Sequence, residues 1–564
     1  MSGSLSALQV LVIDCQASGA TPAHGDLLEM GWAVADGSGT RLAPRAHWLR
    51  PGSDRPVSRA VKKLTGWDES CLESAIDADE AWARVRGESA DARDARTGAI
   101  PTVIHFARFE LPFLHDLHAR SGADAPFPLD VVCLHAVAVR LFPGLPRRNL
   151  RALAGHLGHS PELMRRAHGH VDASAFIWRA LLPKLEEAGV RTWEELKVWL
   201  EAPSPSSRGR NAKRVFPLPT ARRKELPDAP GVYRFLRPNG DVLYVGKAMS
   251  IKKRVASYFT GRSAIERTLE MLSQAHDIAV TETASPLEAA LLETDEIKRL
   301  DPPYNVQLRG RERSAWFADL TWSTTLPATD AEHPVGPLPS AGALRGIAAM
   351  RSLLEGAEPD DGLRAAAVGV PLAFVPDAAL FDEVWRAFAA EQLGGHAPAR
   401  TRILRAAARI VPREKDEDED TPDGWDAATV RRHLERTLVG EGLLVRRARL
   451  LGLLCHAKVT FREPRGACSC GRRLVFVEGQ LVERHDLDEG EPLPDRSGPA
   501  PRPPSRAARL AAFDAARYDR LRVLATELRR IVDQGGDVTV HVGARVLPSY
   551  RGDLRGQAIA PDPD

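Results

Sequence analysis

The chain has 564 residues, enough for three or four domains, and its 43% hydrophobic and 27% charged content is that of an ordinary globular protein. Its 77 Lys and Arg residues nearly balance its 75 Asp and Glu residues, so any nucleic-acid binding must come from local basic patches. Six cysteines scattered over this length exclude a disulfide framework and favour a reducing cytoplasm. The first residues lack a basic segment followed by an apolar run, and no stretch approaches about 18 apolar residues, so we expect neither a signal peptide nor a membrane span.

The first 200 or so residues alternate between expected strands and helices. Residues 8–13 are rich in β-branched side chains and run into Asp14, which is typical of a buried strand. This alternation, with acidic residues at the ends of strands and helices, predicts an α/β domain. The expected strands are 8–13, 27–35, 40–49 and 102–105, and the expected helices are 59–64, 77–86, one that carries 109–114, 130–141, 150–157 and 171–182.

Three acidic motifs in this part resemble those of the DEDD (DnaQ-like) 3′–5′ exonucleases. The family's first strand ends Asp-x-Glu, which corresponds here to residues 14–16 (Asp-Cys-Gln). The second motif corresponds to residues 105–110 (His-Phe-Ala-Arg-Phe-Glu), and the third, a His followed by Asp-Ala, to residues 168–173. The resemblance covers roughly residues 1–190 and implies an RNase H-like fold.

The same resemblance implies metal ligands, with departures that bear on the chemistry. Such enzymes hold two divalent cations with four carboxylates, so Asp14, Glu110 and Asp172 would bind Mg²⁺ or Mn²⁺. Gln16 stands where the family has an acid, and an amide oxygen brings no negative charge to a metal. Glu110 is one methylene longer than Asp, and neither nearby histidine has the family's spacing from Asp172. We therefore favour a domain that keeps the fold and a groove for DNA with weak or lost catalysis; an active exonuclease is the alternative.

Residues 201–225 are rich in Pro, Ser and basic side chains, which is typical of a flexible linker. The basic residues either bind phosphates beside the next domain or only keep a solvated linker soluble, and the sequence leaves both readings open. They are Arg208, Arg210, Lys213, Arg214, Arg222, Arg223 and Lys224.

The next 80 or so residues predict a small α+β domain. Residues 238–241 (Pro-Asn-Gly-Asp) are a strong hairpin signal between two alternating runs. Ser285 is the expected N-cap of a helix, with Glu288 at capping-box spacing. The expected strands are 232–236, 242–246 and 278–284, and the expected helices are 247–258 and 285–299.

Several coupled motifs in this segment resemble the GIY-YIG nucleases of the UvrC/Cho excision-repair type. Residues 231–233 (Gly-Val-Tyr) and 244–246 (Tyr-Val-Gly) match the two halves of the signature, with Val for Ile in each. Residues 247–258 resemble the family's following helix, and residues 288–305 its metal-binding helix and Pro-x-Tyr-Asn ending. Every expected polar position is occupied, so the resemblance implies hydrolysis of a DNA phosphodiester with a single metal.

The resemblance also implies a role for each polar residue. Glu293 would bind Mg²⁺ or Mn²⁺, which favour carboxylate and water ligands. Tyr233 or Tyr244 would take a proton from the attacking water, and Lys247 is a candidate for the cation that lowers the tyrosine pKa.

The remaining positions of the motif would bind or orient. Arg254 would hold the scissile phosphate and stabilise its charge in the transition state. Tyr258 and Asn305 would orient water, phosphate or the motif strands, although Tyr258 is nearly as consistent with plain packing.

Residues 311–564 are less informative. Cys468 and Cys470 are separated by one residue, whereas structural zinc sites usually space cysteines by two to four, so we expect these and Cys455 to be reduced thiols. A helix-hairpin-helix signature and an RNase H-like acid set are not visible, which fits the shorter Cho-type proteins better than full-length UvrC. The expected helices are 341–366, 381–408, 427–454 and one or two within 506–534, and the expected strands are 457–461, 473–478, 480–483 and 537–542.

Together these observations predict a multidomain α/β and α+β protein. Its parts would be a 1–200 exonuclease-like domain, a 201–225 linker, a 226–310 GIY-YIG domain and a mixed, mainly helical 311–564 region. We expect a cytoplasmic excision-repair endonuclease that incises one DNA strand, 3′ to a lesion, with UvrA- and UvrB-type partners. The alternatives are a bifunctional nuclease with an active 3′–5′ exonuclease, or an N-terminal domain that only binds DNA ends or partners.

Overall fold

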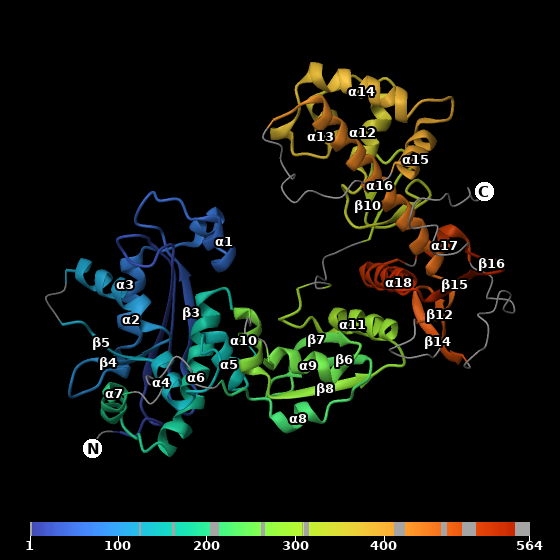
Figure 1. Ribbon diagram of the computed structural model, residues 1–564. Helices are drawn as coiled ribbons and strands as arrows, with labels where there is room; N and C mark the ends of the chain where they lie inside the picture. Colours follow the sequence, from blue (N-terminus) through green and yellow to red (C-terminus); the bar gives the residue numbers. More distant parts are fainter. Residues whose placement is uncertain are drawn as a thin grey trace.

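The computed structural model describes residues 3–122, 126–160, 164–203, 214–260, 265–306, 308, 315–410, 424–463, 471–487, 504–511 and 513–547. Arg208, Arg210, Lys213, Cys468 and Cys470 lie outside these ranges. Within them the chain forms four sheets, which follow one another along the sequence in Figure 1. No helix of the described ranges is long and apolar enough to cross a membrane.

The N-terminal domain is built on a five-stranded sheet in the order β3-β2-β1-β4-β5. The first three strands are antiparallel, whereas β4 runs parallel to β1 and β5 runs parallel to β4. This mixed sheet confirms the predicted RNase H-like fold. The strands are β1 (Val10–Ala17), β2 (Leu27–Ala35), β3 (Thr40–Trp48), β4 (Ile100–Ile104) and β5 (Leu129–Cys133).

Helices cover both faces of this sheet because β1 is apolar on both sides. Val10 and Val12 pack into the same core as the long helix α6, while Leu11 and Ile13 pack with α2 and α3 on the opposite face. The helices are α1 (Arg59–Thr65), α2 (Ala78–Glu88), α3 (Ala107–Arg120), α4 (Leu134–Leu141), α5 (Leu150–His156), α6 (Ala167–Glu187) and α7 (Trp193–Glu201), with short 3₁₀ helices at Glu69–Ser74 and Ala90–Ala92.

The expected helix at 130–141 is wrong in its first part. Val131 and Val132 pair with Thr102 and Val103, so residues 129–133 form the edge strand β5 and the helix begins only at Leu134. β-Branched residues in register with a buried neighbouring strand outweigh a helical pattern that continues past them.

The central domain has three antiparallel strands in the order β7-β6-β8, with α11 packed across them. Lys247 and Ala248 continue the pairing of β7, so the helix expected from 247 begins at Ile251 instead. The hydroxyl of Ser285 caps α11 as predicted. The strands are β6 (Gly231–Leu236), β7 (Val242–Ala248) and β8 (Asp277–Glu282), and the helices are α8 (Thr220–Lys224), α9 (Ile251–Thr260), α10 (Glu266–Gln274) and α11 (Pro286–Leu300).

The C-terminal region begins with a small sheet in the order β10-β9-β11 and a group of helices. The two expected helices at 341–366 and 381–408 are each divided, by Gly356 and Pro359 in the first and by Gly394, Gly395 and Pro398 in the second. The elements are β9 (Trp316–Ala318), β10 (Thr325–Leu326), β11 (Val335–Leu338), α12 (Arg345–Leu354), α13 (Asp361–Val368), a 3₁₀ helix (Leu372–Phe374), α14 (Ala378–Gln392) and α15 (Ala399–Arg409).

A long helix, α16 (Ala427–Leu454), joins this helical group to a second antiparallel sheet in the order β14-β13-β12-β15-β16. Its first half packs in the helical core and its last turns pack in the sheet core. The remaining elements are β12 (Lys458–Arg462), β13 (Gly471–Val477), β14 (Gln480–Leu487), α17 (Arg506–Ala511), α18 (Ala515–Asp533), β15 (Asp537–Val542) and β16 (Arg545–Val546).

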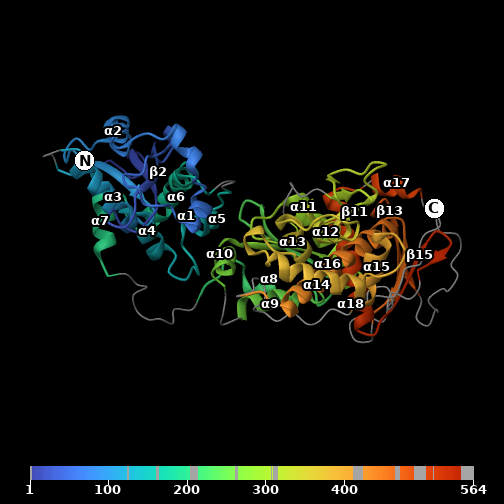
Figure 2. The ribbon, with the colours of Figure 1, turned by 90° about the horizontal axis from the view of Figure 1, so that it is seen from above.

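The central domain contacts both of its neighbours. On one side α10 packs against α5, and on the other α11 packs against α18, as Figures 1 and 2 show. At the first contact the rings of His156 and His276 lie 4.8 Å apart, with a hydrogen bond of 3.0 Å between ring nitrogens. The central domain is therefore held between an N-terminal domain and a C-terminal lobe, which we define as residues 427–547.

Candidate active sites

The two signature strands bring Tyr233 and Tyr244 together around a required glycine. Tyr233 pairs with Gly246 across β6 and β7. A Cβ on Gly246 would lie 2.5 Å from the Tyr233 hydroxyl oxygen and 2.7 Å from the ring of Tyr244, closer than any side chain tolerates. The two tyrosine rings consequently approach to 6.1 Å between centroids.

Tyr258 joins the pair from α9. Its hydroxyl lies 2.8 Å from that of Tyr233, and its ring is 6.4 Å from that of Tyr244. Burial raises the pKa of Tyr233 and of Tyr244, and the charge of a neighbouring tyrosinate would raise each further. The guanidinium of Arg254, 5.1 Å from the ring of Tyr258, is the cation of this cluster; its charge offsets a small part of this rise, and the pKa values of both tyrosines stay above the ordinary value.

Glu293 on α11 meets the end of β7. Its Oε1 accepts a hydrogen bond of 3.0 Å from the backbone N–H of Lys247, and among the described residues none donates to its Oε2. Burial raises the pKa of Glu293, and the charge and N–H of Lys247 partly offset that effect. A half-buried carboxylate with an oxygen to spare fits a hard divalent cation whose other ligands are water and substrate.

The ammonium of Lys247 lies elsewhere than we expected. Its Nζ donates to Glu527 of α18 at 2.6 Å. The sequence suggested that Lys247 would lower the pKa of Tyr244, but the ammonium pairs with Glu527, and Arg254 is the cation whose charge partly offsets the rise in the pKa of Tyr244. The sequence did not indicate a role for Glu527, because it lies 280 positions from Lys247.

Asn305 acts on the backbone of β7. Its side-chain nitrogen donates to the Val245 carbonyl at 2.9 Å, and its side-chain oxygen accepts from the Val245 N–H at 3.0 Å. Both groups of the amide are therefore used to hold the strand between Tyr244 and Gly246, which positions the motif rather than a water or a phosphate.

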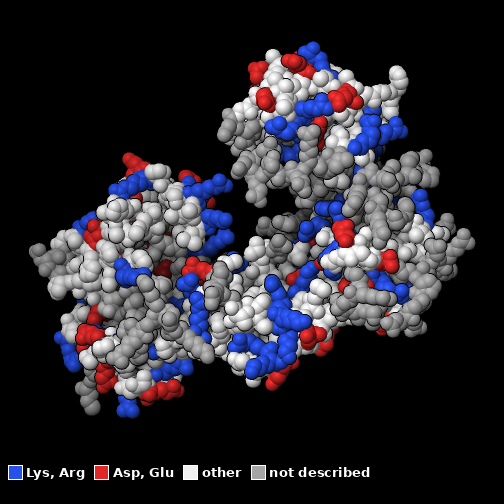
Figure 3. Space-filling model, viewed as in Figure 1, with Lys and Arg blue, Asp and Glu red and all other residues white. Residues whose placement is uncertain are grey.

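A basic surface lies beside this cluster. Figure 3 shows Lys and Arg side chains gathered over the part of the central domain where α8 and α9 lie. A surface of this sign attracts phosphates. The basic residues of these two helices are Arg222, Arg223, Lys224, Lys252, Lys253 and Arg254.

In the N-terminal domain, the predicted acids Asp14 and Glu110 lie together. Asp14 Oδ2 and His170 Nδ1 form a hydrogen bond of 3.0 Å. Glu110 Oε2 accepts a hydrogen bond of 3.0 Å from the Cys15 N–H, and burial together with the charge of Asp14 raises its pKa well above the ordinary range.

Gln16 lies beside them with an unsatisfied oxygen. Its Nε2 donates to the Arg165 carbonyl at 2.6 Å, while its Oε1 is buried without a partner in the described residues. Directly opposite on β2, Glu29 is fully buried and accepts hydrogen bonds from Arg166 at 2.6 Å and from the Ala167 N–H at 2.9 Å. Glu29 could have been singled out from the sequence as the one charge in an otherwise apolar strand.

Asp172 is placed apart from the other two acids. Its carboxylate is half exposed and lies 3.3 Å from His159, which lowers its pKa. Within the described ranges, no three His, Cys, Asp or Glu side chains are grouped as metal ligands. The four-carboxylate arrangement that binds two metals is therefore not assembled from Asp14, Glu110 and Asp172.

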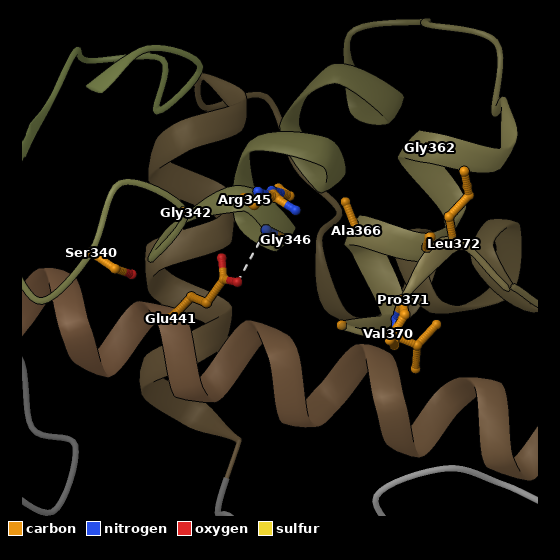
Figure 4. A pocket seen from close by; sticks show the side chains of 12 residues that line it. Ser340, Gly342, Arg345, Gly346, Gly362, Ala366, Val370, Pro371, Leu372 and Glu441 are labelled. Carbon is orange, nitrogen blue, oxygen red and sulfur yellow. Dashed lines mark hydrogen bonds between the residues drawn. The ribbon is translucent and has the colours of Figure 1, made fainter. Parts of the chain in front are cut away.

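A cavity of about 700 Å³ lies in the helical part of the C-terminal region (Figure 4). Glu441 of α16 points into it and accepts hydrogen bonds from the N–H groups of Gly346 at 3.1 Å and Ile347 at 2.8 Å. Burial raises the pKa of Glu441 to about 7. Both oxygens cap the first turn of α12, so we assign Glu441 a structural role.

Comparison with known proteins supports the interpretation of the central domain. Residues 229–306 match the UvrC-like GIY-YIG domain family. A protein of Mycobacterium tuberculosis named "Putative bifunctional exonuclease/endonuclease protein MT2247" is 33% identical over 218 residues, which are 38% of this chain and 32% of that protein. The UvrABC system protein C of Rhizobium meliloti is 42% identical over 129 residues, 22% of this chain and 19% of its own.

A solved structure is also similar to a part of this chain. The N-terminal GIY-YIG endonuclease domain of Thermotoga maritima UvrC, bound to magnesium as its catalytic cation, is 30% identical, with 15% of this chain and 93% of that chain covered and a TM-score of 0.14. The chain spans about a third or less of the length of the two curated relatives. The match of residues 229–306 to the UvrC-like GIY-YIG domain family confirms the resemblance seen in the two signature strands.

Proposed function

We propose that this protein is a metal-dependent DNA nuclease that incises one strand through its GIY-YIG domain. The observation that carries the proposal is the convergence of four elements on one site. Glu293 of α11 keeps an oxygen free in the described residues, and its charge acts on Tyr244 of β7. Tyr233 of β6 and Arg254 of α9 complete the cluster. Metal, proton acceptor and phosphate-binding cation are what phosphodiester hydrolysis requires.

Glu293 would hold the cation, Mg²⁺ or Mn²⁺, with Oε2 while Lys247 N–H fixes Oε1. When bound, the cation supplies positive charge to the phosphate and to the leaving oxygen. Glu293 fits this role because its side chain is half-buried and no other described residue donates a hydrogen bond to it.

Tyr244 is the proton acceptor that we propose for the attacking water. It is partly exposed, whereas Tyr233 is fully buried and its hydroxyl is occupied by Tyr258. Arg254 would bind the phosphate and at the same time lower the pKa of Tyr244. Asn305 keeps Tyr244 in place through the backbone of β7.

The finer parts of the proposal concern process and partners. We infer the division 1–200, 201–225, 226–310 and 311–564, and a cytoplasmic role in nucleotide excision repair with incision 3′ to a lesion and with UvrA- and UvrB-type partners. The names of the UvrABC relatives motivate this choice. The N-terminal domain would bind a DNA end or a partner, because its acids are not grouped as a metal site in the described residues. An active 3′–5′ exonuclease is the second candidate, favoured by the name of the Mycobacterium relative.

Separate substitutions of Glu293 and Asp14 test these proposals. Supercoiled plasmid with Mg²⁺ or Mn²⁺ reports nicking, and a 5′-labelled linear duplex reports trimming of its 3′ end. Glu293→Ala should abolish nicking, and Glu282→Ala, an exposed acid on β8, should not change it. Unchanged nicking by Glu293→Ala would refute the nuclease proposal. Trimming that Asp14→Ala removes would establish the second candidate.

A further inference from the structure

Two ion pairs join the C-terminal lobe to α11, the helix that carries Glu293. Lys298 of α11 lies 2.7 Å from Asp519 of α18, and Arg520 of α18 lies 2.7 Å from Asp295 of α11. Asp519 is almost completely buried. Charges are buried in this way only when they are paired, so α18 is held in one register along α11.

Apolar side chains continue the same contact. Leu287 and Leu291 of α11 belong to one core with Leu521, Leu524 and Leu528 of α18. α11 therefore buries one side in the C-terminal lobe while it carries Glu293 for the nuclease site. The C-terminal lobe is thus packed directly against the helix that carries Glu293.

Glu527 of the C-terminal lobe contacts Lys247, the residue next to the nuclease site. It is only 11% exposed at its side chain; its Oε1 accepts from Lys247 Nζ at 2.6 Å and its Oε2 accepts from Arg530 Nε at 2.6 Å. The backbone N–H of the same Lys247 donates to Glu293. Lys247 of β7 thus contacts both Glu293, the carboxylate that would bind the metal, and Glu527 of the C-terminal lobe.

We propose that Glu527 is a positioning residue that makes the GIY-YIG site able to bind its divalent cation. This inference rests on the proposed function. An unpaired lysine ammonium next to Glu293 would repel a divalent cation, whereas the Lys247–Glu527 pair has no net charge. By holding the side chain, Glu527 also fixes the N–H that orients Glu293.

The hydrogen bonds of Glu527 agree with this role. Burial acts to raise the pKa of Glu527, but hydrogen bonds from Lys247 and Arg530 hold it below the ordinary value. Glu527 therefore carries its charge at neutral pH.

Mn²⁺ binding to the full chain, measured by electron paramagnetic resonance without DNA, tests the inference. We expect Glu527→Gln to raise the Mn²⁺ half-saturation about 3- to 10-fold, because Lys247 is left unpaired beside Glu293. Asp533→Asn removes an exposed acid from the same helix and should leave binding unchanged. Nicking at saturating Mn²⁺ should stay within about 3-fold for Glu527→Gln, since no group that touches the phosphate is altered.

A double variant keeps the test independent of folding defects. Lys247→Gln/Glu527→Gln removes both charges and leaves neither buried and unpaired, so its half-saturation should return to within about 2-fold of the unaltered chain. Native-like Mn²⁺ binding by Glu527→Gln, with binding lost in Glu293→Gln, would overturn this inference alone. Retention of binding in Glu293→Gln would instead contradict the proposed function.

Discussion

The two candidate sites of this chain differ in what surrounds their acids. In the N-terminal domain Asp14 is hydrogen-bonded to a histidine, Glu110 is buried with its pKa raised by burial, and Asp172 pairs with His159. In the central domain Glu293 keeps one oxygen free of described donors, and a cation stands beside the tyrosines. The two sites differ in grouping: among the described residues the three N-terminal acids are not assembled as metal ligands, whereas Glu293, Tyr244 and Arg254 lie in one cluster.

The largest effect that separates the sites should come from Arg254. Arg254→Gln removes the cation that would bind the phosphate and lower the pKa of Tyr244, so we expect the nicking rate to fall roughly 100- to 1,000-fold. Trimming of labelled 3′ ends should not change. Lys253→Gln, on the exposed side of the same helix, should alter nicking by less than about 3-fold. Equal losses in both variants would assign the effect to general DNA binding.

The close approach at Gly246 gives the next effect. In Gly246→Ala the added methyl meets the Tyr233 hydroxyl, so the strand or the tyrosine must shift. We expect nicking to fall about 10- to 100-fold and the free energy of unfolding to fall by about 1–3 kcal/mol. Gly39→Ala, where nothing lies within 4 Å, should change neither quantity. Full nicking by Gly246→Ala would show that the tyrosine geometry is not limiting.

A substitution in the N-terminal domain tests whether a missing charge prevents metal binding there. Gln16→Glu places a third acid beside Asp14 and the buried Glu29. We expect the free energy of unfolding in EDTA to fall by about 2 kcal/mol, because the new carboxylate is buried among like charges. Millimolar Mn²⁺ should restore part of that loss if the charge was what the site lacked. Equal losses with and without Mn²⁺ would show that geometry, rather than charge, prevents metal binding.

The contact between the two domains should respond to pH with a smaller effect. Burial and the neighbouring His276 lower the pKa of His156 from 6.5 to about 4. A group whose pKa is lower in the folded state stabilises that state above pH 6.5, and this stabilisation is lost as the pH falls from 6.5 towards 4. We expect about 1–2 kcal/mol less stability at pH 5 than at pH 7.5 from this group.

Urea unfolding at the two pH values measures this dependence. His156→Gln should reduce it by about 1–2 kcal/mol, whereas His24→Gln, at an exposed position, should leave it unchanged. A dependence that persists undiminished in His156→Gln would assign the acid sensitivity to other groups.

Local patterns in the sequence predicted most of the fold around the sites. Alternation and the hairpin signal at 238–241 placed β6 and β7, and the Ser285 cap placed α11. The pattern at 130–141 merged β5 with α4, because the strand depends on pairing with β4, which is a long-range interaction. The helix expected from Lys247 failed for the same reason, since pairing with β6 extends β7 to Ala248.

The sequence predicted which residues form the candidate sites but not which residues surround them. Family resemblance named Glu293, Tyr244 and Arg254, and the structure brings them into one cluster. The resemblance could not show that Lys247 would contact Glu527 or that Asp172 would pair with His159. Each of these contacts joins two segments whose distance is set only by tertiary packing.

The number of tight Mn²⁺ sites per chain tests the central claim most directly. Electron paramagnetic resonance titration of the full chain should give one such site, which Glu293→Gln removes and Asp14→Asn leaves intact. Two sites in the unaltered chain, with one lost in Asp14→Asn, would contradict the account, since the N-terminal acids would then bind a metal as the GIY-YIG domain does.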